Sequence, residues 1–346
     1  MVRLAESMSP NMQKHPVSRR TMLRRAGLLL SGAGALASLR GISLGADSDA
    51  PVAEGKTPPL SKKAMTALDE ALGGKKGSYI ENEGVYTTAL PRNDLQITIK
   101  GDPVPIAFGF GGWASIKRTL DGQQAMLMSD TVLLQEEVNP LISAAQNRNL
   151  QVTAIHNHFF YENPRIFYMH LHGMGDPVDL ARKYGAAIQN TKLHPSNQPS
   201  SATSSGAPGA KGAFDLAALD RTIGHTGKAN GPVYKYVVGR DDLRVIAMGA
   251  EVTTAIGLNT WAAFAGDSNA AHIAGDVAML ESEVNPVIRA LRQHDLEVVA
   301  VHQHMLEEQP RIIFLHYYSR GPALTLAEGF RAALDQLGGK GKQAGS

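Results

Sequence analysis

The chain contains two copies of one module, and this duplication constrains its fold more than any other feature. The segment from His156 to His170 returns as His302 to His316, with three histidines, one glutamate and a Pro-Arg-Ile triplet at identical spacing. Upstream, Arg-Asn-Asp-Leu at 92–95 matches Arg-Asp-Asp-Leu at 240–243, and Glu-Val-Asn-Pro at 137–140 returns at 283–286. Self-similarity at a fixed period indicates repeated structural units, so we expect two tandem homologous domains.

The same order of elements is predicted in both copies. Apolar residues at helical spacing (Met65, Leu68 and Leu72) indicate a first helix. Alternating and β-branched stretches predict strands, and Pro140 suits the first turn of a central helix because its missing N–H is not needed there. We therefore predict an α+β fold in which each domain is a mostly antiparallel sheet packed with helices. In the first copy the strands are expected near 84–90, 95–100, 104–110, 125–134, 150–158 and 165–172, and the later helices near 136–148 and 177–189.

The N-terminal residues are typical of a targeting signal rather than of part of the fold. Ser-Arg-Arg-Thr-Met-Leu-Arg at 18–24 is typical of a twin-arginine export signal, and small residues follow at Ala37 and Ala46, where cleavage is expected. The alternative is a basic amphipathic N-terminal helix. The export interpretation predicts the twin-arginine machinery as a partner and a periplasmic or secreted location.

Composition divides the rest of the chain. Residues 47–60 are expected to be a disordered lead-in, 61–190 the first repeat, 191–213 a linker rich in Ser, Pro and Gly, 214–338 the second repeat and 339–346 a tail.

Charge and residue usage exclude several classes of protein. Residues 1–46 carry seven Lys/Arg and one acidic residue, so their removal changes the formal charge from +2 to −4 and gives no reason to expect a nucleic-acid partner. The absence of cysteine excludes disulfides, thiolate zinc sites and thiol catalysis. Since no apolar run reaches membrane-spanning length, we expect no stable membrane anchor.

Seven of the twelve histidines lie in the two predicted hairpins that contain the duplicated segments. Side chains alternate along a strand, so Val152, Ala154, His156 and His158 are expected to share one face. Ile166, Tyr168, His170 and His172 are expected to share a face of the return strand. If the loop turns symmetrically around Asn163, His156 lies opposite His170 and three imidazoles converge. The predicted metal ligands are His156, His158 and His170 in the first copy and His302, His304 and His316 in the second.

These residue types suit a transition metal ion. Neutral imidazole binds Zn, Fe, Mn or Cu, and three protein ligands with an open position favour catalysis. Glu162 and Glu308, at the hairpin ends, are candidates for a fourth ligand or a catalytic general acid/base. His172 is replaced by Tyr318 in the second copy, so it is treated as accessory. The alternatives are histidines that only pack and hydrogen bond, and a metal-free acid/base site.

Other duplicated residues suggest structural functions. Asp130 and Asp276 precede the central helices, and Glu137 and Glu283 begin them, so we interpret all four as stabilising helix N-termini. Arg165 and Arg311 are expected to pair with a neighbouring carboxylate; the alternative is that they hold an anionic substrate. Trp113 and Trp261 are expected to fill the core.

Two resemblances follow from these motifs. His-x-His-x3-Glu, in both copies, is similar to the first metal motif of cupins in its ligands, although cupins bring their last histidine from a distant strand. The longer pattern from Asp130 to His170, repeated from Asp276 to His316, resembles the bacterial LppY/LpqO family. That resemblance implies an exported envelope protein built from a tandem domain of unknown function. It departs from the family name in one respect, because a chain without cysteine cannot be lipidated at a lipobox.

Three functional hypotheses follow. The favoured one is an exported metal-binding protein with one tri-histidine site in each repeat, acting as a metal-dependent hydrolase or oxidoreductase on an unknown small-molecule ligand. The second is a non-catalytic periplasmic metal- or ligand-binding module. The third is a purely structural duplicated domain.

Overall fold

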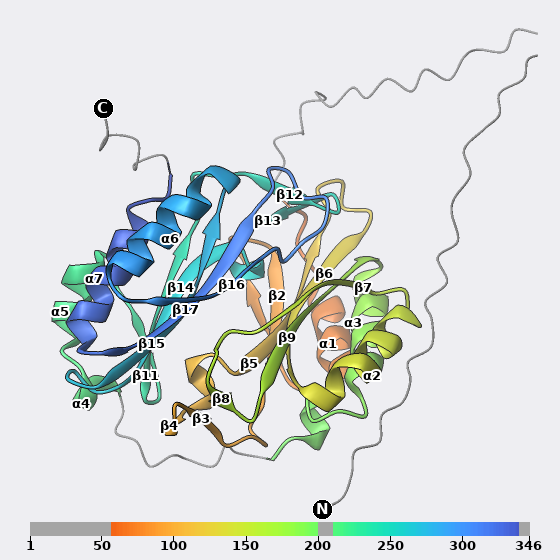
Figure 1. Ribbon diagram of the computed structural model, residues 1–346. Helices are drawn as coiled ribbons and strands as arrows, with labels where there is room; N and C mark the ends of the chain where they lie inside the picture. The colour runs from red at the N-terminus through yellow and green to blue at the C-terminus, as the bar shows by residue number, and fades with distance from the viewer. Residues whose placement is uncertain (1–56, 200–209, 339–346) are drawn as a thin grey trace, which may run out of the picture. The chain divides into compact units, whose positions relative to one another are not determined.

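The structure is a computed structural model that describes residues 57–199 and 210–338 (Figure 1). The predicted export signal at 1–46, most of the lead-in, and the tail from residue 339 lie outside these residues. Both repeats belong to one unit that spans Ala53–Ser346.

The first repeat begins with helix α1 (Lys62–Ala71), whose N-terminus is capped by the Ser61 side chain accepting a hydrogen bond from Ala64 N–H. Leu68 and Leu72 are fully buried, as their spacing predicted. The elements that follow are β1 (Ser78–Ile80), β2 (Val85–Pro91), β3 (Ile97–Ile99), β4 (Asp102–Val104), the 3₁₀ helix η1 (Ile106–Phe108), β5 (Gly111–Arg118), β6 (Ala125–Leu134), α2 (Gln135–Gln146), β7 (Gln151–His156), β8 (Glu162–Asn163), β9 (Ile166–Gly175) and α3 (Pro177–Ile188).

The second repeat follows the same order. Between the repeats the structure describes two short elements, η2 (Pro195–Asn197) and α4 (Ala210–Ala213). The second repeat consists of α5 (Leu216–Ile223), β10 (Lys228–Asn230), β11 (Val233–Gly239), β12 (Val245–Ala247), β13 (Ala250–Val252), η3 (Thr254–Ile256), β14 (Asn259–Gly266), β15 (Ala271–Met279), η4 (Glu281–Glu283), α6 (Val284–Gln293), β16 (Glu297–His302), β17 (Ile313–Gly321) and α7 (Ala323–Leu334).

Each repeat forms a six-stranded antiparallel sheet. The first sheet has the order β1-β2-β5-β6-β9-β7, and the second has the equivalent order β10-β11-β14-β15-β17-β16. A small sheet accompanies each large one. It consists of β3, β4 and β8 in the first repeat and of β12 and β13 in the second. The predicted α+β class, with two tandem homologous domains of mostly antiparallel sheet and helices, is confirmed.

Two predicted elements differ from the structure. The strand expected at 104–110 is a short strand followed by the 3₁₀ helix η1, and the strand β5, which pairs with both β2 and β6, was not predicted. The physical reason is burial on both faces. The segment from Ala114 to Lys117 is buried throughout, so β5 lacks the apolar–polar alternation that marks a half-exposed strand. Its two initial glycines further weaken the signal.

The apolar clusters show that each sheet has helices on one side only. Helices α1, α2 and α3 pack on the first sheet, and α5, α6 and α7 pack on the second (Figure 1). The opposite faces of the sheets share two mixed clusters, in which Tyr168 packs with Ala274 and Met128 packs with Phe314. The described residues therefore form a helix–sheet–sheet–helix arrangement, in which the two repeats meet through their sheets.

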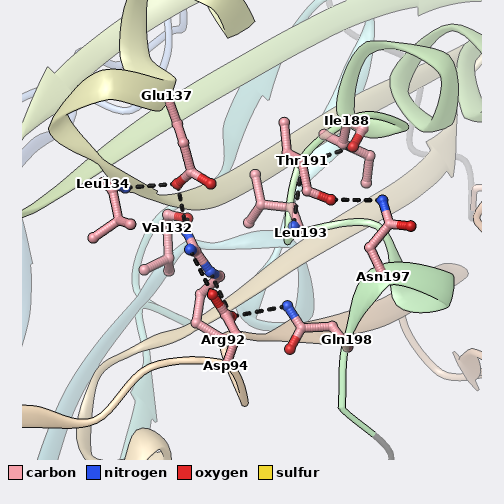
Figure 2. A network of polar contacts seen from close by, with 10 residues as sticks. All are labelled: Arg92, Asp94, Val132, Leu134, Glu137, Ile188, Thr191, Leu193, Asn197 and Gln198. Carbon is pink, nitrogen blue, oxygen red and sulfur yellow. Dashed lines mark hydrogen bonds and ion pairs between the residues drawn. The ribbon is translucent and has the colours of Figure 1, made fainter.

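A buried arginine explains the duplicated Arg-x-Asp-Leu motif (Figure 2). The Arg92 guanidinium donates hydrogen bonds to Asp94, to the Val132 carbonyl and to Glu137. Glu137 also accepts a hydrogen bond from Leu134 N–H, which caps helix α2. Arg240 repeats these bonds with Asp242, Ala278 and Glu283. The prediction that Glu137 and Glu283 stabilise helix starts is confirmed.

Among the described residues, no helix combines the length and the apolar character that crossing a membrane requires.

Candidate metal centre

Six of the duplicated histidines lie where the two sheets face each other. His156 ends β7 and His158 lies just beyond it, whereas His170 lies in the middle of β9. The second repeat places its three histidines on β16, beyond β16 and on β17 in the same way. All are buried or nearly so; the buried ones are His156, His158, His170, His304 and His316, and His302 is partly exposed.

The predicted register of the hairpin is wrong by two residues. His170 pairs with Ala154 rather than with His156, which lies opposite Tyr168, and the second repeat shows the same shift. A β-bulge between Val152 and Ala154 also changes the face of the sheet on which the preceding side chains lie. Val152 therefore packs against the helices instead of sharing a face with His156. The loop is not a simple symmetrical turn, because Glu162 and Asn163 leave the hairpin and pair with strand β3.

The histidines of the two repeats stack on each other. The ring centres of His156 and His302 are 3.6 Å apart. The ring centres of His158 and His316 are 3.7 Å apart, and those of His304 and His170 are 4.0 Å apart. In addition, the Thr153 hydroxyl donates a 2.6 Å hydrogen bond to the His304 carbonyl. Each repeat therefore completes the histidine cluster of the other. The favoured sequence hypothesis placed one site in each repeat, although the duplication itself left open that the two halves form one site.

Four histidines could hold a metal ion together. One ring nitrogen from each of His156, His302, His304 and His316 lies within 4.8 Å of the other three. Three of these residues belong to the second repeat and one to the first. His170 is adjacent, with its Nε2 atom 2.9 Å from Nε2 of His156. His158 lies against Tyr168, with ring centres 3.2 Å apart.

Backbone carbonyls orient three of the rings. Nδ1 of His170 lies 3.0 Å from the Ser129 carbonyl, Nδ1 of His316 lies 3.1 Å from the Gly275 carbonyl, and Nδ1 of His302 lies 3.2 Å from the Gln303 carbonyl. A carbonyl oxygen only accepts, so Nδ1 must donate and Nε2 carries the lone pair. This outer hydrogen bond is a usual feature of histidines that bind metal.

Burial keeps the cluster uncharged. Desolvation lowers the pKa of each of these histidines below its ordinary value, and neighbouring histidines lower the pKa of His156, His158 and His304 further. For His302, burial lowers the pKa to about 4. The imidazoles are consequently neutral at neutral pH, which is the form that binds metal.

The two predicted catalytic glutamates hold the hairpin loops. Glu162 accepts hydrogen bonds from Ile166 N–H and from the Arg165 guanidinium at 3.1 Å. Glu308 accepts from Ile312 N–H and lies 3.5 Å from the Arg311 guanidinium. The expected pairing of both arginines with a neighbouring carboxylate is confirmed. Neither glutamate belongs to the four-histidine group, so their chemical role remains a prediction.

The sequence interpretation missed two acids of the site. Across each sheet, Trp113, Asp130 and His170 are lateral neighbours, and Trp261, Asp276 and His316 repeat the row. Asp276 Oδ2 lies 3.5 Å from His304 Nε2 and 3.9 Å from His316 Nε2. Both aspartates thus belong to the histidine cluster instead of the helix starts. Their equal placement within the repeats, on buried apolar strands, was the available signal.

Burial also changes the charge of these acids. Desolvation raises the pKa of Asp130 to about 7, although the positive charge of Lys235 opposes the change. Desolvation, and then the nearby Asp130, raises the pKa of Asp276 well above its ordinary value. The pair therefore carries less than two negative charges at neutral pH.

The tryptophans lie beside the cluster and only partly fill the core. Trp113 packs on Gly257 and contributes to a mixed cluster, and Trp261 contributes to the other. The Trp261 ring centre is 6.2 Å from that of His158 and 6.4 Å from that of His316.

Comparisons with known proteins place the chain in a family. Microcompartment shell proteins match with low similarity. A double-ringed trimeric shell protein of the RMM microcompartment is 10% identical with a TM-score of 0.18, and the match covers 62% of this chain and 83% of that one. The trimeric bacterial shell protein PduB is 13% identical with a TM-score of 0.18, and the match covers 76% of this chain and 94% of that one. EtuB from Clostridium kluyveri is similar at 11% identity and a TM-score of 0.17, covering 66% and 88%. Similarity this low carries no argument. The search of curated proteins finds no match. The model of a domain of unknown function (DUF1259) matches residues 66–190 and again 217–336, and the chain therefore belongs to that family.

Proposed function

We propose that this protein binds one transition metal ion in a centre shared by its two repeats. The observation that carries the proposal is the group of four imidazole nitrogens, drawn from both repeats and lying within 4.8 Å of one another. Nitrogens that hold one ion at about 2.1 Å lie at most about 4.2 Å apart, so the rings need only a small inward movement.

Unpaired buried nitrogens favour a metal ion over histidines that merely pack. Nε2 of His302, Nε2 of His316 and both ring nitrogens of His304 are buried without a hydrogen-bond partner. Each unpaired buried polar atom costs about 1–3 kcal/mol, which one coordinated ion would offset. Since the rings are neutral, no proton has to leave before the ion binds.

The residues around the centre support chemistry as well as storage. A bound ion would supply Lewis acidity, which activates water or polarises a ligand. Asp276 lies beside two proposed ligands, and burial raises its pKa, so it holds a proton more readily than an exposed aspartate. We infer a metal-dependent hydrolase or oxidoreductase. Glu162 and Glu308 stay candidates for proton transfer, as the sequence predicted.

The same proposal includes export. The twin-arginine motif at 18–24 supports a periplasmic or secreted protein, and the Asp130–His170 pattern supports a protein of the LppY/LpqO type. Twin-arginine export carries folded proteins, which suits a centre that exists only after both repeats have folded together.

Elemental analysis tests the proposal. Protein purified without chelator or affinity tag is expected to contain about one equivalent of a single transition metal. His304→Ala should lose it, whereas the control His194→Ala, in the segment after α3, should retain it. Two equivalents lost independently by substitutions in each repeat would overturn the shared centre. A lack of metal, with no stabilisation by added Zn, Fe, Mn or Cu, would overturn the function altogether.

If the metal is present but no turnover of any substrate class follows, the alternative function is a non-catalytic periplasmic metal- or ligand-binding module. The burial of the centre between two sheets is the observation that favours it, because buried ligands exchange slowly.

A further inference from the structure

A groove of about 1040 Å³ opens beside the histidine centre. We call it the Lys235 groove. Its walls are mainly apolar, and they come from the first repeat and from the turn before β11; they include Pro91, Ile97, Val104, Ile106, Trp113 and Lys235. This volume suits a small molecule, and a largely apolar lining with few polar groups is typical of ligand sites.

A difference between the equivalent turns of the two repeats explains why the groove is open beside the β10–β11 turn. The β10–β11 turn consists of Gly231 and Pro232, and both residues line the groove. The equivalent β1–β2 turn of the first repeat spans residues 81–84 and is longer by two residues. Its Glu83 side chain reaches the 3₁₀ helix η3 and accepts a 2.8 Å hydrogen bond from Ala255 N–H. The short glycine-proline turn has no side chain that could cover η1 in this way.

Of the described residues that line the groove, Lys235 is the one that carries a charge. Lys235 on β11 takes the place of Thr87 on β2, whose hydroxyl is bonded to Ser115. Small Ala263, opposite Lys235, leaves space for the long side chain. The ammonium lies 4.3 Å from the Trp261 ring centre. His158 and His316 also lie beside the Trp261 ring, so an anion at Lys235 would be separated from these histidines by the indole.

The charge of the loaded centre favours an anion as well. The proposed ligands are neutral imidazoles and do not neutralise a divalent ion. Burial lowers the pKa of Lys235 to about 8, although Asp130 and Asp276 oppose the change, so the ammonium stays mostly charged at neutral pH.

We propose that the Lys235 groove binds the substrate of this protein, and that the substrate is a small apolar molecule with one carboxylate group. The carboxylate pairs with Lys235 beside Trp261, and the apolar body lies along Ile97, Val104 and Ile106. This inference rests on the proposed metal function, which it deepens by assigning a class of substrate.

Intrinsic fluorescence measures the interaction directly, because the only two tryptophans of the chain are Trp113 and Trp261. Octanoate and octan-1-ol, which differ in charge, are titrated into metal-loaded and chelator-treated full-length protein. Octanoate should change the emission saturably and bind at least about tenfold more tightly than octan-1-ol, because a hydrogen bond between two charged groups is stronger than one to a neutral hydroxyl.

Two variants locate the site. Lys235→Met should reduce octanoate binding to that of octan-1-ol, while Lys228→Met, on exposed β10, should leave it unchanged. Ala107→Phe, which fills the groove without touching Lys235, should weaken both probes. Equal binding of the two probes, a full octanoate response in Lys235→Met, or an unaffected Ala107→Phe would each overturn the inference.

Metal content, measured on the same samples, separates the two proposals. Metal-loaded protein without an octanoate response overturns the groove inference alone and leaves the metal function intact. Protein that binds octanoate but takes up no metal overturns the metal function, and with it the claim that the bound carboxylate is a substrate.

Discussion

The two repeats agree closely at the centre of the molecule and differ at its edges. Both carry the same Trp-Asp-His row and the same His-x-His ending of the preceding strand. At positions outside the four-histidine group, which we call the edge positions, Tyr318 replaces His172 and Lys235 replaces Thr87. The central histidines contact rings of the other repeat, so a change there affects both repeats. Tyr318 also contacts Phe159 of the first repeat, but neither edge residue belongs to the proposed ligand group, which leaves room for one repeat to specialise.

The largest expected effect comes from the buried arginines. Arg240→Met leaves Glu283, which is almost fully buried, without its partner and should destabilise the protein by about 3–5 kcal/mol. Arg92→Met should destabilise it less, because its partner Glu137 is more exposed to water than Glu283. Urea denaturation of both variants measures the difference. A larger loss in Arg92→Met would contradict the role assigned to burial.

Metal affinity tests whether the two halves of the cluster are equal. His304→Ala removes a member of the four-nitrogen group and should weaken binding by more than about 100-fold. His158→Ala removes its counterpart, which supports His316 from outside that group, and should weaken binding by about 10–100-fold. Competition with a chromogenic chelator gives both values. Equal losses would show that the ion lies equally close to the histidines of both repeats.

The pH dependence of the metal-free protein tests the buried imidazoles. Their pKa values are lowered by folding, so the unfolded chain binds more protons below its ordinary histidine pKa of 6.5. The contribution of these histidines to stability is therefore fully present above about pH 6.5 and is lost as the pH falls towards 4, the approximate pKa of His302. The raised pKa values of Asp130 and Asp276 offset part of this loss. Thermal unfolding of chelated protein, from pH 7.5 to 4.5, follows this loss. The variant His302→Ala should show a shallower decline, and an identical slope would contradict the assignment.

The smallest effect is expected at the edge position that differs between the repeats. Tyr318→His gives the second repeat the residue of the first and removes a 2.8 Å hydrogen bond to His272. The expected destabilisation is about 1 kcal/mol, with unchanged metal content. Calorimetry and elemental analysis check both parts. A loss of metal in this variant would show that position 318 belongs to the centre rather than to the edge.

Local patterns were enough for much of the fold and less for the site. The alternation of side chains predicted which residues share a face of β9, among them Tyr168 and His170. The self-similarity of the two copies predicted the duplicated helices. Strand β5 was not predicted, because it is buried on both faces and therefore lacks the alternation of apolar and polar residues. Asp130 and Asp276 were assigned to helix ends because sequence distance, the only distance available, placed them near those helices.

The sequence by itself determined that this protein is a duplicated α+β domain with histidines gathered on one face of each sheet, because periodicity reports which side chains share a face. Only the tertiary structure decided what that face meets. The stacking of His156 on His302, the shared centre, and the groove left open by the Gly231-Pro232 turn all depend on contacts between residues far apart in the chain. Spacing within one segment carries no information about such contacts, because they form only when one sheet packs against the other.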